Sequence, residues 1–457
     1  MGMTRRIFAR GSAGIACTTL APSAGFGADP KTTLRAGAAE TVVTPEKGVL
    51  LIGPMKAAEG VHDDLFARIL VLDDGDIRLV IATLDYLGFD FAYTNVLLKA
   101  IAEAADVPVV NVMLNCSHTH SAPLSAPWGP WLKEKNLPFH HFLPERLAKI
   151  TRQATSTLRP AIARHHREPV QIGFNRRLLH NGRITMEPNP HGAVLPWVDV
   201  LVLEESGGEE IAMLFSHAAH PVIVHDTSTL ISADYPGFAV EQVRRKSSGK
   251  SICLFAQGCG GNINAFPWRG GIDAAKAAGR DLGRVALRAS SFKDARKAGG
   301  VLKTESLHLD LPLQAPPTVK ELRAMIAKEK HPGNRARREE LLAIAESGEK
   351  PTASFPIRAF SMGRDLCMLG MPNEPFAEYH LFANKASAFR HTFAFGYTNG
   401  MECYIGTKKD YELGMNGGYE TSPFGAALMF KNRLPLALEA ESMIQQGIKT
   451  VLQKLAA

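Results

Sequence analysis

The chain has 457 residues, of which 45% are hydrophobic and 21% are charged, and its formal net charge is +7. This composition is typical of a globular protein with a large core, and it excludes a disordered or fibrous chain. The positive charge is mild for this length, and no basic run alternates with aromatic residues. The sequence therefore argues against a nucleic-acid-binding protein.

The first 27 residues resemble an export signal. Arg5 and Arg6 lie in a segment similar to the twin-arginine motif, and a weakly apolar stretch follows at 11–20. This stretch is too short and too rich in Gly, Ala and Thr to span a bilayer. We expect residues 1–27 to be removed and residues 28–457 to be periplasmic or secreted. The five cysteines that remain contain no CxxC pair, so no disulfide framework is expected.

The rest of the chain alternates between strand-like and helix-like segments. Apolar runs predict strands at 68–72, 79–84, 107–114, 198–203, 211–215, 251–256, 366–370 and 392–397. Periodic patterns predict helices at 93–105, 144–158, 237–245 and 434–455. This alternation predicts a single α/β domain, in which helices flank a layered β-sheet that is mixed or mostly parallel.

Residues 319–350 differ from their surroundings. They are densely charged and have a helical pattern that is broken at Pro332–Gly333. Such a segment is typical of a solvated helical hairpin on the domain surface. The alternative is an arm that binds a partner.

The most informative motif follows the predicted strand at 107–114 and contains His118 and His120. Alternate residues of a strand share a face, so both imidazoles would point into the same space. Ligand crevices form at the carboxyl ends of strands in open α/β sheets, and imidazole is the commonest metal ligand. The motif therefore favours a metal site of the zinc-hydrolase type. The alternative is a pair of hydrogen-bonded histidines in a polar turn.

Polar residues also follow other predicted strands. His220 comes after the strand at 211–215, and Glu374 lies between two prolines after the strand at 366–370. Two histidines and a carboxylate form the usual open catalytic zinc site. Glu374 could instead cap a helix, because Pro375 suits a first helical turn. Four further residues near strand ends are weaker candidates: His217, His225, Tyr404 and Tyr419.

The order of these motifs resembles the catalytic N-terminal domain of the neutral, non-lysosomal ceramidase family. Members share Thr-His-Thr-His-Ser-Gly-Pro at a strand end, which residues 117–123 match. They share a histidine before Ile-Ser-Ala-Asp, matched by His220 and residues 231–234. A Pro-Gly-Glu element and two tyrosine motifs are matched by residues 372–374, 404–405 and 419–420, and residues 60–68 are also similar. The matched segments occur in the same order in the chain.

The resemblance implies the fold of that domain and a role for each matched residue. A zinc ion (Zn2+) would be bound by His118, His220, Glu374 and Tyr404. The implied catalytic and substrate-contacting residues are His120, which would face the substrate, Arg176, which would contact a substrate oxygen, and Tyr419, which would reach toward the scissile group.

One departure affects the expected reaction. Ceramidases carry a serine in Gly-Asp-x-Ser-Pro-Asn, and residues 261–266 occupy that place here with Asn262 for the aspartate and Asn264 for the serine. An amide is not a nucleophile of the activated hydroxyl kind. The chain is therefore expected to be a divergent member, in which Asn264 is a polar substrate contact. Cys259 is five residues away and is a poor substitute.

Zinc-activated water needs no serine. The leading hypothesis is a periplasmic zinc-dependent hydrolase of an amide (N-acyl) bond, with His120 as general acid or base and Arg176 and Tyr419 as oxyanion contacts. One alternative is hydrolysis of an ester, lactone or glycosidic bond of a small polar substrate at the same site. A second is a non-catalytic zinc-containing binding protein. The expected partner is a small molecule, either an N-acyl lipid or a polar compound, and four aromatic residues could line its pocket: Trp128, Trp131, Phe266 and Trp268.

Overall fold

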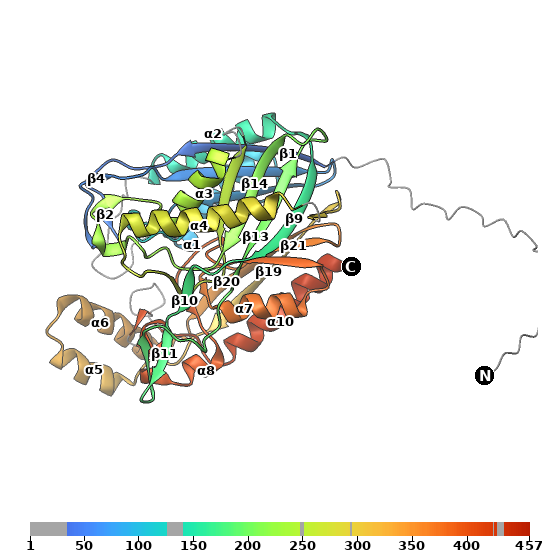
Figure 1. Cartoon of the computed structure of the whole chain (residues 1–457). Helices are drawn as coiled ribbons and strands as arrows, with labels where there is room; N and C mark the ends of the chain where they lie inside the picture. Colours follow the sequence, from blue (N-terminus) through green and yellow to red (C-terminus); the bar gives the residue numbers. More distant parts are fainter. Residues whose placement is uncertain (1–33, 126–139, 247–250, 293–294, 424, 427–433) are drawn as a thin grey trace, which may run out of the picture.

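The computed structural model describes residues 34–457 except 126–139, 247–250, 293–294, 424 and 427–433 (Figure 1). The predicted export signal and the two tryptophans Trp128 and Trp131 lie outside the described residues. Within the described part of the chain, no helix combines the length and the apolar character that crossing a membrane would require.

Three large β-sheets form the body of the molecule. The first has the order β7–β6–β5–β1–β8, the second β16–β14–β13–β9–β18, and the third β19–β20–β21–β23. Most neighbouring strands are antiparallel, but each sheet contains a parallel pair: β6–β7, β14–β16 and β21–β23. The prediction of an α/β fold with mixed sheets is therefore confirmed. The strands of these sheets are β1 (Arg35–Val42), β5 (Phe66–Asp73), β6 (Arg78–Leu84), β7 (Val112–Cys116), β8 (Arg159–Pro160), β9 (Ile162–Pro169), β13 (Trp197–Glu204), β14 (Glu210–His217), β16 (Ile252–Gln257), β18 (Arg296–Lys297), β19 (Leu302–Pro312), β20 (Thr352–Met362), β21 (Leu366–Gly370) and β23 (His391–Phe395).

Five two-stranded ribbons complete the sheet structure. They pair β2 (Leu50–Leu51) with β3 (Lys56–Ala57), β4 (Gly60–Val61) with β15 (Leu230–Ile231), β10 (Gly173–Asn175) with β17 (Ile263–Ala265), β11 (Arg177–His180) with β12 (Arg183–Met186), and β22 (Glu374–Pro375) with β24 (Tyr404–Ile405).

The inner faces of the three large sheets share one apolar core. Each sheet contributes side chains that are at most 1% exposed: Leu70 and Ile81 from the first, Leu201 and Leu254 from the second, and Phe360 and Phe393 from the third. Alternate residues of the same strands, such as Ile69 and Val71, face outward into a second apolar layer. Strands buried on both faces have nearly continuous apolar runs, which is why these runs were visible in the sequence.

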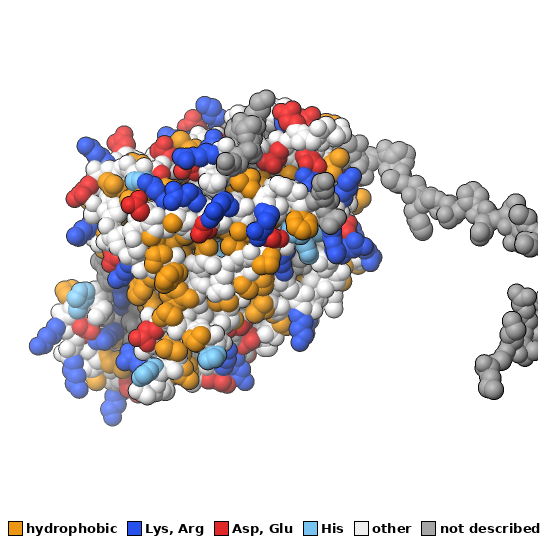
Figure 2. Space-filling view, viewed as in Figure 1, with side chains coloured by type: hydrophobic (Ala, Val, Ile, Leu, Met, Phe, Trp, Pro, Cys, Tyr) orange, Lys and Arg blue, Asp and Glu red, His pale blue; other side chains and the backbone are white. Residues whose placement is uncertain are grey.

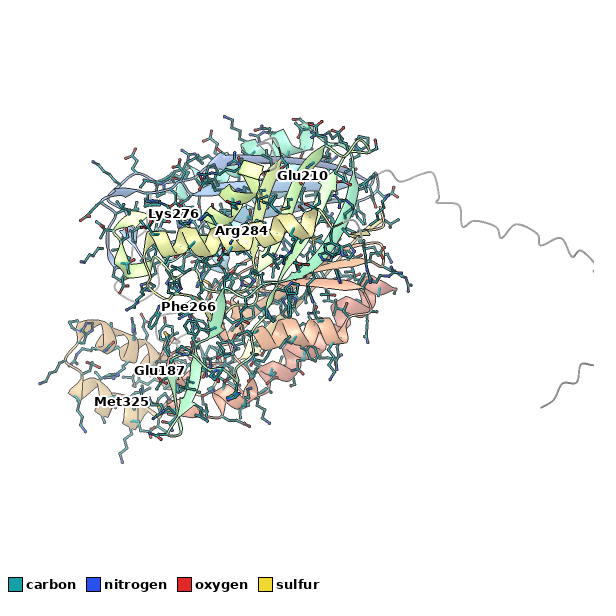
Figure 3. All side chains as sticks on the ribbon, viewed as in Figure 1. Glu187, Glu210, Phe266, Lys276, Arg284 and Met325 are labelled. Carbon is teal, nitrogen blue, oxygen red and sulfur yellow. The ribbon has the colours of Figure 1, made fainter. Side chains whose placement is uncertain are left out.

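Helices cover the outer faces of the sheets. The first sheet packs against α1 (Phe91–Ala105) and α2 (Leu143–Ser156), the second against α3 (Asp234–Lys246) and α4 (Ile272–Ser290), and the third against α7 (Ala377–Ala386) and α10 (Ala440–Ala456). The inner face of α4 buries mostly small residues, such as Ala275 and Gly279, together with Leu282. Of the two α4 residues labelled in Figure 3, Arg284 is exposed and Lys276 lies over the Phe238 ring of α3.

Residues 319–350 contain two helices, α5 (Val319–Lys328) and α6 (Pro332–Ser347). They lie together at one end of the molecule (Figure 1) and meet through Leu322 and Leu341. Two short helices near the site are α8 (Lys408–Tyr411) and α9 (Gly418–Thr421).

Two predicted elements differ from the structure. The run at 107–114 is not a continuous strand, because Pro108 precedes a 3-10 turn at Val109–Asn111 and β7 begins only at Val112. Asn111 donates its side-chain amide to the Arg78 carbonyl oxygen (3.0 Å). The last helix begins at Ala440 rather than at residue 434, since Leu436 forms an isolated β-bridge with Leu313.

The carboxyl ends of the three parallel pairs meet at Asn115 on β7. The Asn115 side-chain amide donates to the carbonyl oxygens of Gln257 (3.1 Å), at the end of β16, and of Gly396 (2.7 Å), just after β23. Its Oδ1 accepts from the Gln257 backbone N–H (2.8 Å). One buried side chain thus joins all three sheets at the edge from which the site loops start.

Candidate metal centre

The loops after the parallel pairs bring the four predicted metal ligands together. His118 follows β7, His220 follows β14, and Glu374 begins β22 shortly after β21. Tyr404 begins β24, which pairs with β22 so that Glu374 and Tyr404 are direct partners in the register. All four side chains are at most 6% exposed. Each ligand is therefore held at a strand end by the sheet below it.

The backbone bends sharply where these loops leave the sheets. His118, Asn373 and Tyr397 have φ angles of 67°, 66° and 49°. Such left-handed conformations are uncommon outside glycine, and they concentrate at functional sites. The prediction that His118 and His120 converge is right, but its reason is wrong. The strand β7 ends at Cys116, and a turn rather than strand alternation directs the two imidazoles.

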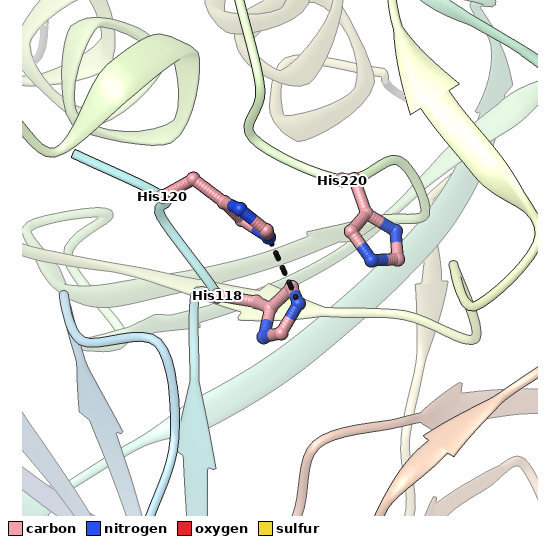
Figure 4. Close-up of side chains that lie close together, drawn as sticks. All are labelled: His118, His120 and His220. Carbon is pink, nitrogen blue, oxygen red and sulfur yellow. Dashed lines mark hydrogen bonds between the residues drawn. The ribbon is translucent and has the colours of Figure 1, made fainter. Parts of the chain in front are cut away.

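The candidate ligand atoms lie close together, and Figure 4 shows the three histidines His118, His120 and His220. His118 Nε2 is 3.3 Å from His120 Nε2 and 3.3 Å from Glu374 Oε2. His220 Nε2 is 3.0 Å from Glu374 Oε2 and 3.4 Å from the Tyr404 hydroxyl. Ligands about 2.0–2.1 Å from a tetrahedral zinc ion are about 3.3 Å apart. Three of the six separations among the four predicted ligands are therefore close to the edge of a zinc tetrahedron.

Backbone carbonyls fix the tautomers of both ligand histidines. His118 Nδ1 lies 2.7 Å from the Leu87 carbonyl oxygen, and His220 Nδ1 lies 2.7 Å from that of Gly260. A carbonyl oxygen only accepts, so each Nδ1 carries a proton and donates it. Each Nε2 then presents a lone pair toward Glu374. This arrangement is the usual outer contact of a metal-binding histidine.

The charges of these groups also favour a cation between them. Burial, assisted by Arg176, lowers the pKa of His220 to about 4, so this imidazole is neutral at pH 7. In these tautomers the Nε2 lone pairs of both histidines face the Glu374 carboxylate. A positive ion satisfies all three, and the donor set of nitrogen and oxygen atoms suits zinc.

Arg176 links two other predicted site residues, Asn264 and Tyr404, and also binds Glu420. From the end of β10 its guanidinium donates to Asn264 Oδ1 (2.9 Å), Glu420 Oε1 (2.7 Å) and the Tyr404 hydroxyl (3.1 Å). Arg176 is 3% exposed, and Glu420 also pairs with Arg177. A buried cation thus lies directly behind one face of the candidate centre, where it can stabilise negative charge.

The segment that replaces the ceramidase serine contains no activated nucleophile. Asn264 is 2% exposed, and its amide oxygen accepts from Arg176. Cys259 is fully buried, and burial raises the pKa of its thiol. A buried neutral thiol is a poor nucleophile. Neither residue offers an attacking group.

His120 and Tyr419 are the predicted site residues with more exposure. Burial and the neighbouring imidazoles lower the pKa of His120 well below its usual range, which leaves it neutral. Because its Nε2 lies beside His118 Nε2, the three histidines His118, His120 and His220 form a possible metal-binding group with nitrogens within 4.8 Å of one another. His120 is thus a candidate ligand as well as the predicted substrate contact. Tyr419 is 40% exposed, with its ring 5.9 Å from that of Tyr404.

The two weaker histidine candidates occupy different places. His217 donates to the Trp197 carbonyl oxygen (2.8 Å) and is buried away from the candidate ligands. His225 stacks on His120, with ring centroids 5.3 Å apart.

Tyr397, whose ring lies 4.3 Å from that of His118, was not among the predicted site residues. It lies two residues after the end of β23, so the strand-end argument that selected Glu374 could have selected it too.

Comparisons with known proteins agree with the fold. No family model matches the sequence, and no curated protein does. The structure of neutral ceramidase from Pseudomonas aeruginosa is similar with a TM-score of 0.71 and 20% identity, over 93% of this chain and 75% of that one. A structure described as a ceramidase complexed with C2 is similar at 0.71 and 19% identity, over 92% and 75%. This chain therefore has the fold of the neutral ceramidases, as the order of its motifs predicted.

Proposed function

We propose that this chain is a zinc-dependent hydrolase that cleaves an amide (N-acyl) bond with activated water. One observation carries the proposal: the Nε2 lone pairs of His118 and His220 converge on Oε2 of Glu374, with both Nδ1 atoms fixed by carbonyls. Tyr404 is the fourth proposed ligand. The ceramidase fold supports the hydrolytic class.

Zinc bound by these residues would lower the pKa of a coordinated water and polarise a substrate carbonyl. The chain's own residues supply the remaining chemistry. His120 is neutral and can accept a proton and later return it to the leaving group. Arg176 provides a buried positive charge beside Tyr404, which suits a developing oxyanion. Asn264 is a polar contact that Arg176 orients.

A second function uses the same residues on an ester, lactone or glycosidic bond of a small polar substrate. The observation that favours it is Asn264, which accepts from Arg176 and stands where the ceramidase motif has serine. A changed residue at the place that would contact the reacting bond suits a different type of bond. The third candidate is a zinc-containing binding protein without catalytic activity. Zinc analysis and a substrate screen together distinguish the three.

The first test measures zinc in the protein covering residues 28–457. We expect one zinc ion per chain, and we expect His118→Ala to lose most of it. His308→Ala is the matched control, because His308 is an exposed histidine paired only with Asp310. Absence of zinc from the unaltered protein would contradict every zinc-dependent reading.

The second test offers the zinc-loaded protein N-acyl lipids, N-acyl amino acids, lactones and aryl glycosides. Turnover of N-acyl compounds supports the leading proposal, and turnover confined to lactones, esters or glycosides supports the second. Zinc binding without any turnover supports the binding protein.

We also propose export of the folded chain to the periplasm by the twin-arginine route. Arg5 and Arg6 support this proposal, as do the five described cysteines, which are buried and free of disulfides. Replacing both arginines by lysine should retain the full-length chain in the cytoplasm, which cell fractionation measures. Unchanged export would contradict the proposal.

A further inference from the structure

Four tyrosines are among the largest fully buried side chains: Tyr86, Tyr235, Tyr379 and Tyr397. Three of them donate to a backbone carbonyl oxygen: Tyr86 to Val43 (2.8 Å), Tyr235 to Ala219 (2.6 Å) and Tyr379 to Gly406 (2.8 Å). The hydroxyl of Tyr397 is equally buried, but it makes no hydrogen bond to any described residue. Native proteins seldom bury a hydroxyl in this way without a use for it.

Tyr397 is also the one of these four whose ring packs on the candidate metal ligands. Its ring centroid lies 4.3 Å from that of His118 at 33°, and 6.0 Å from that of His220 at 87°. Its backbone N–H donates to the carbonyl oxygen of Asn373, the residue before Glu374 (3.0 Å). Tyr397 is therefore fixed against the segments that supply three of the four proposed ligands.

Packing alone does not explain a tyrosine at this position. Phenylalanine would fill the same volume and contact the same imidazoles without burying a hydroxyl. The backbone of Tyr397 is left-handed, with φ of 49°, and such a conformation is costly for a bulky residue. A strained aromatic residue with an unused polar atom, packed on two proposed ligands, points to a role for the hydroxyl in the centre.

We propose that the Tyr397 hydroxyl donates a hydrogen bond to an oxygen atom of the molecule held at the metal centre, and so is a further catalytic residue. A phenol has an ordinary pKa of about 10 and is a donor at neutral pH. The inference rests on the proposed zinc hydrolase. The resemblance implied that Tyr419 contacts the scissile group, and this inference gives that contact to Tyr397 instead. Tyr419 is 40% exposed and packs against Tyr404.

The test uses Tyr397→Phe and two probes, zinc alone and acetohydroxamate, whose oxygen atoms bind zinc. We expect the variant to bind zinc about as tightly as the unaltered protein, and to bind acetohydroxamate about 10- to 100-fold more weakly. Its metal-free melting temperature should be unchanged or higher, because no described group loses a hydrogen bond. Tyr379→Phe is the matched control, because it leaves the Gly406 carbonyl oxygen without its donor. Its melting temperature should fall, and its acetohydroxamate affinity should stay the same.

Three results would overturn the inference, and they differ from one another. Equal acetohydroxamate affinity in Tyr397→Phe removes the proposed contact. A melting temperature that falls as far as that of Tyr379→Phe makes the hydroxyl structural. Failure of the unaltered protein to bind zinc, measured before acetohydroxamate is added, overturns the proposed function itself and this inference with it.

Discussion

At the scale of single residues, Glu374 contributes most to the candidate centre, because its Oε2 faces both His118 and His220. Glu374→Gln keeps the shape but removes the negative charge. We expect zinc affinity, measured by titration against a chelator, to fall by more than the roughly 10-fold that loss of an outer contact causes. The metal-free variant should be at least as stable as the unaltered protein, since its amide can donate to the imidazole lone pairs that the carboxylate repels.

Glu378→Gln is the control for this change. Glu378 is a nearby, partly buried glutamate that accepts from the side chain of Asn262 (2.9 Å), and none of its described contacts is with the ligand histidines. Its zinc affinity should match that of the unaltered protein. If Glu374→Gln also retained full affinity, the carboxylate would not be a ligand.

His118 and His120 differ in burial, and a pair of variants separates their roles. His118→Ala should lose zinc, since a buried ligand with a fixed tautomer is removed. His120→Ala should retain zinc but lose turnover by roughly 100- to 10,000-fold, as expected for a general acid or base. Zinc analysis and kinetics on both proteins check this. If His120→Ala loses zinc as completely as His118→Ala, then His120 is a third histidine ligand and the predicted division between them is wrong.

The sequence could predict those site residues whose positions follow from strand ends. His118, His220 and Glu374 each come after an apolar run, and chain order alone places them at sheet edges. Arg176 and Asn264 were reached only through the family resemblance, because β10 and β17 are three residues long and have no periodic pattern. The bonds from the two histidines to the carbonyl oxygens of Leu87 and Gly260 could not be predicted, because every residue type has a backbone carbonyl.

At the scale of elements, the hydrogen bonds of the Asn115 side chain connect the three large sheets. We therefore expect a change at Asn115 to affect both the free energy of unfolding and the zinc affinity. Asn115→Ala removes four hydrogen bonds, two to Gln257 on β16 and one each to Gly396 and Thr398 after β23. We expect the free energy of unfolding to fall by about 3 kcal/mol, since buried backbone groups lose partners. Zinc affinity should also fall, because His118 lies three residues beyond this joint.

Urea unfolding and zinc titration measure both effects of Asn115→Ala. Asn111→Ala is the control, because this asparagine makes one side-chain bond, to the Arg78 carbonyl oxygen, at the other end of the strand. It should cost about 1 kcal/mol and leave zinc affinity unchanged. If Asn115→Ala is less stable but binds zinc normally, the loops that carry the proposed ligands do not depend on these hydrogen bonds for their positions.

The elements that the sequence revealed are those buried on both faces. β5, β6, β13, β14 and β21 gave continuous apolar runs, whereas β9 and β19 have alternate residues exposed or half-buried and were not predicted. The division into three sheets was not predictable either. It depends on which strands hydrogen-bond to one another, and the hydrophobic pattern of a strand does not specify its neighbour.

At the scale of the whole molecule, buried histidines outside the centre determine the response to acid. Burial lowers the pKa of His217 to about 4, although its bond to the Trp197 carbonyl acts in the opposite direction. Burial and Arg167 lower the pKa of His380 to about 3. In the unfolded chain both histidines have a pKa near 6.5. Below that pH the unfolded chain binds protons that the native state does not, so stability is lost as the pH falls from about 6.5 toward about 4.

His217→Gln tests this response, because glutamine keeps an N–H donor for Trp197 but does not titrate. At pH 4.5, His217 alone should account for about 2.5 kcal/mol of lost unfolding free energy, and the variant should lose that much less between pH 7.5 and 4.5. Urea unfolding of the metal-free protein at both pH values measures the difference. His308→Gln, at a histidine whose side chain is 56% exposed, should leave the pH dependence unchanged. Equal pH dependence in all three proteins would mean that His217 is protonated in the native state, and acid sensitivity would then have to arise from other buried histidines such as His380.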